Sequence, residues 1–149
     1  MAVAAVSIDI SRSPDDVFWY ATDFSQFGRW QGSVVSARPE GKSARVTGSR
    51  AAVTRRVGPR RVRATETITE LTPPRAWEVR SSGGLPVTAI AKGRIEPLDG
   101  GHRSRVTIAL DFEGHGIGRL LIPLVIRRQA RKQLPQNAAK LKEALEQGG

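Results

Sequence analysis

The chain has 149 residues, a length typical of one domain with a single hydrophobic core. Apolar residues make up 39% of it and charged residues 26%, which excludes a disordered chain, and the absence of Cys excludes disulfides, thiolate metal sites and a Cys nucleophile. Lys and Arg outnumber Asp and Glu by 24 to 14, and the net charge of +10 favours anionic partners without choosing among them.

The N-terminal part of the chain predicts one strand followed by two short helices. The strand is indicated by alternating apolar residues that end at Ile8 and Ile10. Ser13 has the position of a helix N-cap, with Pro14 as the first helical residue. A second helix would be capped by Thr22 or Asp23 and would carry three aromatic side chains, Phe24, Phe27 and Trp30.

From residue 33 onward the apolar period changes to two, which indicates strands. They are predicted at 33–38, 45–57, 60–71, 75–82, 86–97 and 103–113. Gly, Pro and Asp residues typical of turns separate them. Sequential strands with short links favour an antiparallel meander, and with the first strand the sheet has about seven strands.

The last part of the chain, residues 116–147, has helical periodicity. Its buried face is marked by Leu134, Ala138, Leu141 and Leu145. Pro135 removes a backbone donor, so we predict a kink or break near residues 131–135. The order of elements indicates an α+β fold in a single domain, 1–149, whose curved sheet wraps around the terminal helix and leaves a cavity.

The strand at 60–71 places one carboxylate, Glu66, on its apolar face. A carboxylate in such surroundings is costly unless it has a partner. If the turn at Gly58-Pro59 joins the two neighbouring strands, Arg55 shares this face and becomes the candidate partner. The alternative is that Glu66 lies at the cavity mouth and is hydrated.

The walls of the predicted cavity follow from the same alternation. Flat indole rings and small alanine side chains leave room for a planar or sterol-like ligand, although ordinary core packing is the alternative for each Trp. The candidate wall residues are Trp30, Val53, Ala64, Ile68, Trp77, Ala91, Ile108, Leu110, Leu121 and Val125, with Arg55 and Glu66 as polar anchors.

Three segments resemble one known superfamily. The opening Ser7-Ile8-Asp9-Ile10, Ser13-Pro14-Asp15-Asp16-Val17-Phe18, Asp23 and Trp30 resembles that of SRPBCC proteins, the START and Bet v 1-like group, and is most similar to bacterial polyketide cyclase/dehydrase-type members. Residues 70–77 resemble the family's link between central strands, and residues 100–106 its Gly-Gly hairpin. The resemblance implies a helix-grip fold with an apolar cavity for lipids, polyketides or similar molecules. It does not imply catalysis.

Most catalytic chemistries lack the residues they need. His102 and His115 are the only histidines, and no metal-site spacing surrounds them. No Gly-x-Ser-x-Gly motif and no complete phosphate loop occurs. We therefore expect no cofactor and no metal, and the one candidate catalytic residue is Glu66 as an acid or base.

Binding or transport of a hydrophobic small molecule is the function that this pattern favours. A polyketide cyclase/dehydrase-like enzyme is the first alternative. The second is a basic surface protein: cations flank an apolar run and suit an anionic membrane, namely Arg119, Arg127, Arg128, Arg131 and Lys132. A nucleic-acid partner is disfavoured because exposed aromatic residues for stacking are lacking. No secretory signal is recognisable, so a cytoplasmic location is expected, and the oligomeric state stays open.

Overall fold

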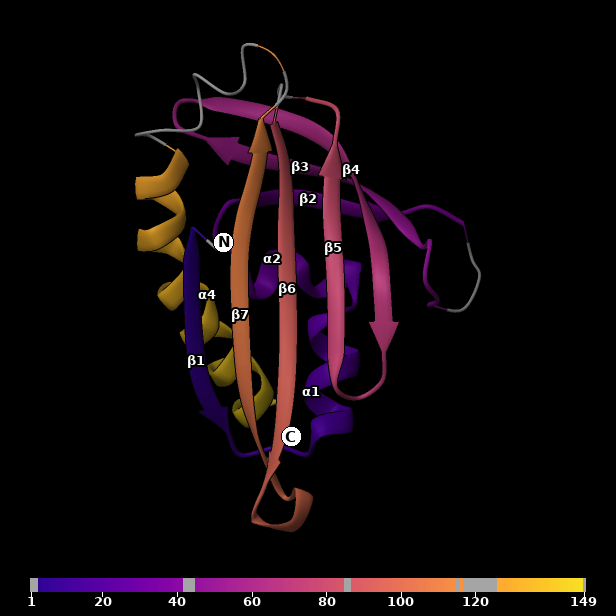
Figure 1. Ribbon diagram of the computed structural model, residues 1–149, viewed down its shortest axis with the longest axis vertical. Helices are drawn as coiled ribbons and strands as arrows, with labels where there is room; N and C mark the ends of the chain where they lie inside the picture. Colours follow the sequence, from indigo (N-terminus) through magenta and orange to yellow (C-terminus); the bar gives the residue numbers. More distant parts are fainter. Residues whose placement is uncertain (1–2, 42–44, 85–86, 115, 117–125, 149) are drawn as a thin grey trace.

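Seven antiparallel strands form one curved sheet, with the helices behind it (Figure 1). The computed structural model describes residues 3–41, 45–84, 87–114, 116 and 126–148. The strands are β1 (Ala4–Ile10), β2 (Val34–Pro39), β3 (Arg50–Val57), β4 (Arg60–Thr72), β5 (Ala76–Ser82), β6 (Val87–Leu98) and β7 (Arg103–Gly114). Their order in the sheet is β1-β7-β6-β5-β4-β3-β2, so β2 to β7 form an antiparallel meander and β1 pairs with β7 at one edge. This confirms the α+β architecture expected from the sequence.

Two predicted caps shape the helical corner after β1. The Ser13 hydroxyl accepts a hydrogen bond from the Asp16 amide at 3.2 Å and starts α1 (Pro14–Ala21). Asp23, rather than Thr22, caps the next turn, since its carboxylate accepts from the Ser25 amide at 3.0 Å. The corner continues as the 3₁₀ helix η1 (Phe24–Gln26) and α2 (Phe27–Trp30).

The long C-terminal helix, α4 (Arg127–Gln147), runs without interruption through Pro135. The predicted break near residues 131–135 is therefore wrong. Pro135 is exposed and removes only one donor, while buried side chains on both sides, Leu134 and Ala138, hold the helix against the molecule. The preceding part of the predicted helix, with Leu121 and Val125, lies outside the described residues.

The strand predicted at 45–57 begins later, at Arg50. Residues Val46 to Ser49 form a turn instead, in which the Ser49 amide donates to the Val46 carbonyl at 3.0 Å. Gly48 lies in this turn with φ of 98°, a conformation that a strand does not use. The other predicted strands agree with the structure to within one or two residues.

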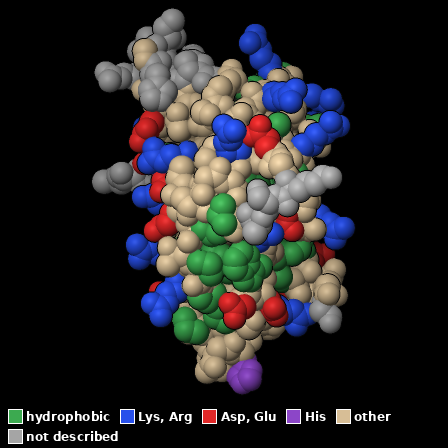
Figure 2. Space-filling view, turned by 90° about the vertical axis from the view of Figure 1, so that its right-hand side faces the viewer, with side chains coloured by type: hydrophobic (Ala, Val, Ile, Leu, Met, Phe, Trp, Pro, Cys, Tyr) green, Lys and Arg blue, Asp and Glu red, His purple; other side chains and the backbone are tan. Residues whose placement is uncertain are grey.

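The core occupies the space between the sheet and the helical corner. Its fully buried side chains come from β1, α1, β3, β4, β7 and α4, and include Ile10, Phe18, Val53, Ile68, Val106 and Leu141. Large apolar side chains that stay exposed are Trp19, Val35 and Val46. On the face shown in Figure 2, apolar side chains gather in the lower half, whereas Lys and Arg side chains lie at the upper edge and along both sides.

Candidate functional site

A cavity of about 190 Å³ lies between α4 and the concave face of the sheet. Alternation along the strands supplies its apolar wall, because residues two apart point to the same side. Val53 on β3 faces Ala64 on β4, and Ala91 on β6 faces Leu110 on β7 in the strand register. The small side chains Ala64 and Ala91 leave the space that larger residues would fill.

Most of the predicted wall residues line this cavity. Those that do are Trp30, Val53, Arg55, Ala64, Glu66, Ala91, Ile108 and Leu110. Ile68 and Trp77 do not, although both are buried. The remaining two, Leu121 and Val125, fall outside the part of the chain that the structure describes.

Trp77 lies in the core because α1 covers its part of the concave face. Its indole ring meets the Phe18 ring edge-on, with centroids 6.1 Å apart. On the neighbouring strand it occupies the position left open by Gly93, where a Cβ atom would overlap the indole ring. The predicted role of Trp77 and Ile68 as cavity walls is therefore wrong, and ordinary core packing holds for both.

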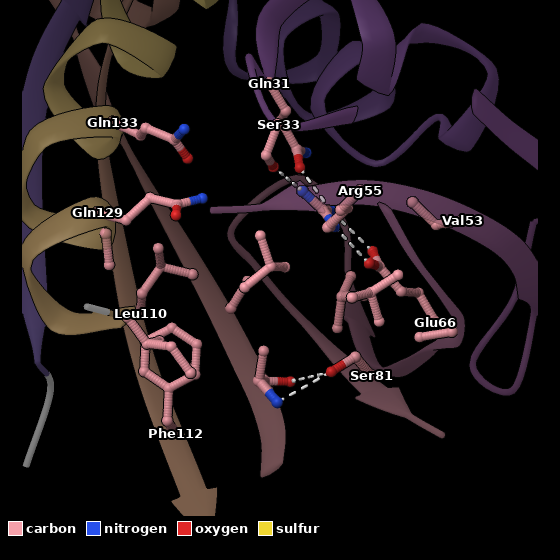
Figure 3. A pocket seen from close by; sticks show the side chains of 18 of the residues that line it. Gln31, Ser33, Val53, Arg55, Glu66, Ser81, Leu110, Phe112, Gln129 and Gln133 are labelled. Carbon is pink, nitrogen blue, oxygen red and sulfur yellow. Dashed lines mark hydrogen bonds and ion pairs between the residues drawn. The ribbon is translucent and has the colours of Figure 1, made fainter. Parts of the chain in front are cut away.

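Arg55 and Glu66 form the predicted pair on the cavity wall. The Arg55 Nε donates to one carboxylate oxygen of Glu66 at 2.7 Å, and its Nη2 donates to the other at 2.9 Å (Figure 3). Glu66 is 4% exposed, so a charge there requires such a partner. The alternative of a hydrated Glu66 at the cavity mouth does not hold.

Two polar residues after α2, Gln31 and Ser33, complete the environment of Arg55. Arg55 Nη2 donates to the Gln31 side-chain oxygen at 2.7 Å, and Nη1 donates to the Ser33 hydroxyl at 3.0 Å. A guanidinium has five N–H donors, and the two bonds to Glu66 together with those to Gln31 and Ser33 use four of them. One N–H, on Nη1, has no acceptor among the described residues. Sequence reasoning missed both new partners, because loop residues follow no period.

The side of α4 that faces the cavity carries a row of amides one turn apart, Gln129, Gln133 and Asn137. Gln129 binds the β3–β4 turn, and the Asn137 oxygen accepts from the Gly32 amide at 2.9 Å. Gln133 points from α4 toward the cavity in Figure 3 and makes no hydrogen bond with the described residues. The three amides are spaced i,i+4 beside the apolar face of the helix, and this spacing could have predicted that they share one side of it.

Two further polar groups complete the lining. The Ser81 hydroxyl already accepts from the Ala89 amide at 2.9 Å. The buried Nε1 of Trp30, in contrast, has no acceptor among the described residues. Within the described ranges, no group of three or more His, Asp or Glu residues could hold a metal ion. No described helix is both long and apolar enough to span a membrane.

The family comparison covers nearly the whole chain. Residues 1–146 match the family model described as polyketide cyclase / dehydrase and lipid transport. No curated protein matches the chain in sequence.

Solved structures share the fold at low sequence identity. A START superfamily protein from Mycobacterium smegmatis has a TM-score of 0.79 at 13% identity, with 98% of each chain covered. TTHA0849 from Thermus thermophilus has a TM-score of 0.77 at 17% identity, again with 98% of each covered. The di-domain ARO/CYC BexL of the BE-7585A biosynthetic pathway has a TM-score of 0.71 at 16% identity, over 96% of this chain and 46% of that one. These similarities show the helix-grip fold expected from the sequence.

Proposed function

Since the chain belongs to the polyketide cyclase/dehydrase and lipid transport family, we propose that its cavity binds one compact, mainly apolar small molecule. The carrying observation is a largely apolar cavity whose wall holds the buried Glu66, doubly hydrogen-bonded to the half-buried Arg55. An apolar cavity of about 150 Å³ holds a benzene ring. A volume of about 190 Å³ therefore favours a ligand of one or two fused rings over a diacyl lipid.

The polar groups of the cavity favour a ligand that carries a neutral oxygen. Among the described residues, one N–H on Arg55 Nη1 has no acceptor, and the Gln133 amide on the opposite side of the cavity has no hydrogen-bond partner. The charge of Arg55 is already balanced by Glu66, so a ligand carboxylate would bring a second negative charge close to Glu66. A ketone or phenol can accept the free N–H without that repulsion.

A cyclase or dehydrase acting on a polyketide is the second candidate, supported by the family description. In that case the free Arg55 N–H would stabilise negative charge on a ligand carbonyl. Glu66 is a poor candidate for the acid or base, because both of its oxygens accept hydrogen bonds from Arg55. Release of the ligand unchanged supports a binding protein, and its conversion to a product supports an enzyme.

Two probes of equal shape test the proposed polarity of the site. 2-Acetylnaphthalene carries a neutral carbonyl and 2-naphthoate a carboxylate, and their affinities can be compared by calorimetric titration. We expect the ketone to bind wild-type protein about tenfold more tightly, because the carboxylate meets Glu66. In Glu66→Gln the charge of Arg55 is no longer balanced, and the preference should shift toward 2-naphthoate.

Glu70→Gln is the matched control, since like Glu66→Gln it removes one negative charge, but from an exposed position on β4 outside the cavity lining. It should leave the preference for the ketone unchanged. A folded wild-type protein that binds neither probe, or that binds 2-naphthoate as tightly as the ketone, contradicts the proposal. An equal shift in Glu70→Gln and Glu66→Gln would reduce the effect to net charge.

A further inference from the structure

The acidic residues are absent from two long segments of the chain. Residues 41–65 contain eight Lys or Arg residues and no Asp or Glu. Residues 114–142 contain seven Lys or Arg residues and again no Asp or Glu. The excess of positive charge is therefore concentrated in two parts of the sequence rather than spread evenly.

The fold brings these two segments together. Gln129 in the first turn of α4 accepts from the Gly58 amide at 3.2 Å and donates to the Arg56 carbonyl at 3.1 Å. Figure 1 shows the β3–β4 turn and the start of α4 at the same end of the molecule. We call this surface the basic end and define it by its exposed cations, Arg56, Arg60, Arg61, Arg63, Arg127, Arg128, Arg131 and Lys132.

The cations of the basic end form no ion pair with any carboxylate in the described part of the chain. Elsewhere, arginines are paired, for example Arg105 with Asp9 at 2.8 Å and Arg103 with Asp99 at 3.2 Å. Arg56 and Arg61 even lie directly opposite each other on neighbouring strands. Like charges in that position destabilise a sheet, and an anionic partner would relieve the repulsion.

The cavity reaches the surface at this end. Its lining includes exposed residues of two hairpins, Arg56 and Gly83, together with Ile126 and Gln129 at the start of α4. We propose that the basic end docks the protein onto an anionic lipid membrane, with the cavity opening toward the bilayer. An apolar ligand could then pass between membrane and cavity without crossing water.

The surface fits a membrane better than a nucleic acid. Single-stranded nucleic acids are held by aromatic stacking as well as charge, and no exposed aromatic side chain lies at the basic end among the described residues. Among the described residues the exposed large aromatic is Trp19 on α1, at the other end of the sheet from the β3–β4 turn (Figure 1). Anionic headgroups need only a broad cationic surface.

Vesicle co-sedimentation tests the proposal with matched charge variants. The probes are vesicles of phosphatidylcholine alone and of phosphatidylcholine with phosphatidylserine. We expect binding only to the second kind, weakened about fivefold for each basic-end cation removed. The test variants are Arg60→Gln/Arg61→Gln and Arg127→Gln/Arg128→Gln. The control Lys92→Gln/Arg94→Gln removes the same charge from exposed positions on β6 and should bind like wild type.

Three outcomes would overturn the proposal. The first is equal binding to both kinds of vesicle, and the second is an equal loss in the β6 control. The third is that wild-type protein binds no vesicles but binds poly(U), and that the basic-end variants lose this binding. That result would make nucleic acid the partner. Because none of the four test positions lines the cavity, titration with 2-acetylnaphthalene should be unchanged in these variants. Failure of docking is thereby distinguished from failure of ligand binding.

Discussion

Gly93 is the residue whose missing side chain fixes the position of Trp77. A Cβ atom there would overlap the indole ring, and Trp77 is 4% exposed with Phe18 against it. We predict that Gly93→Ala lowers the free energy of unfolding by about 2 kcal/mol through overpacking. Chemical denaturation measures this change.

The matched control is Gly28→Ala, where the added methyl would meet only Val34 Cγ1 at an ordinary 3.9 Å. It should leave stability within about 0.5 kcal/mol of wild type. Equal stability of both variants would show that Trp77 can move, and would contradict its assignment to a rigid core.

The Arg55–Glu66 pair could be predicted from the sequence, because a short turn and a period of two fix which side chains share a face. The positions of Ile68 and Trp77 could not. Alternation shows that they point inward, but not that α1 covers their part of the sheet. Gln31 and Ser33 lie in a loop, where no periodicity relates sequence to position.

The anchoring of the C-terminal end of α4 to β1 depends on Glu146. The Ser11 amide donates to its carboxylate at 2.9 Å, and this bond, assisted by Lys142, holds the pKa of Glu146 below its ordinary value of 4.5. A lowered pKa stabilises the fold at pH values above the ordinary pKa, and the contribution is lost as the pH falls through the lowered value. Wild type should therefore exceed Glu146→Gln in stability at neutral pH, and the difference should vanish in acid.

Thermal unfolding across this pH range measures the difference, with Glu143→Gln on the exposed face of the same helix as control. The control should show little pH-dependent difference from wild type. A constant gap between wild type and Glu146→Gln at every pH would contradict the role assigned to the carboxylate.

Pro135 leaves the carbonyl of Arg131 without its helical donor inside α4. Because the helix is continuous there, we predict that Pro135→Ala restores the bond and raises the free energy of unfolding by about 1–3 kcal/mol. Gln136→Ala, at the next exposed position, should change stability by less than about 0.5 kcal/mol. A Pro135→Ala protein no more stable than wild type would contradict the regular geometry of this turn.

At the level of elements, the sequence predicted the strands and the first helix well, since alternation and capping are local signals. β3 begins later than predicted because the chain turns around Gly48. The apolar residue Val46 before this turn is typical of a strand, so the sequence pattern does not indicate the turn. The continuity of α4 depends on tertiary packing of Leu134 and Ala138, which outweighs the local effect of Pro135.

For the whole molecule, the cavity exists because small side chains line a curved sheet beneath α4. We predict that Ala91→Leu fills part of it, keeps the protein folded and abolishes binding of 2-acetylnaphthalene in titrations. The same substitution at Ala109, on the opposite face of neighbouring β7, should leave binding intact. Retained binding in Ala91→Leu would place the ligand elsewhere.

The order of elements predicts a cavity, but it does not predict the size of that cavity. The volume of the cavity depends on the distance between α4 and the sheet and on the amide side chains of α4, including Gln133. The alternation of residues along the strands predicts neither. Likewise, the sequence showed many cations but not that the β3–β4 turn and α4 bring them to one end.

A structure of the protein in complex with 2-acetylnaphthalene tests the central claim most directly. We predict that the rings pack against Ala91 and Leu110 on the concave face of the sheet, with the carbonyl oxygen about 2.7–3.2 Å from Arg55 Nη1. A ligand bound outside the cavity, for example over the exposed Trp19, would contradict the account. An empty cavity in crystals grown with the ligand would contradict it as well.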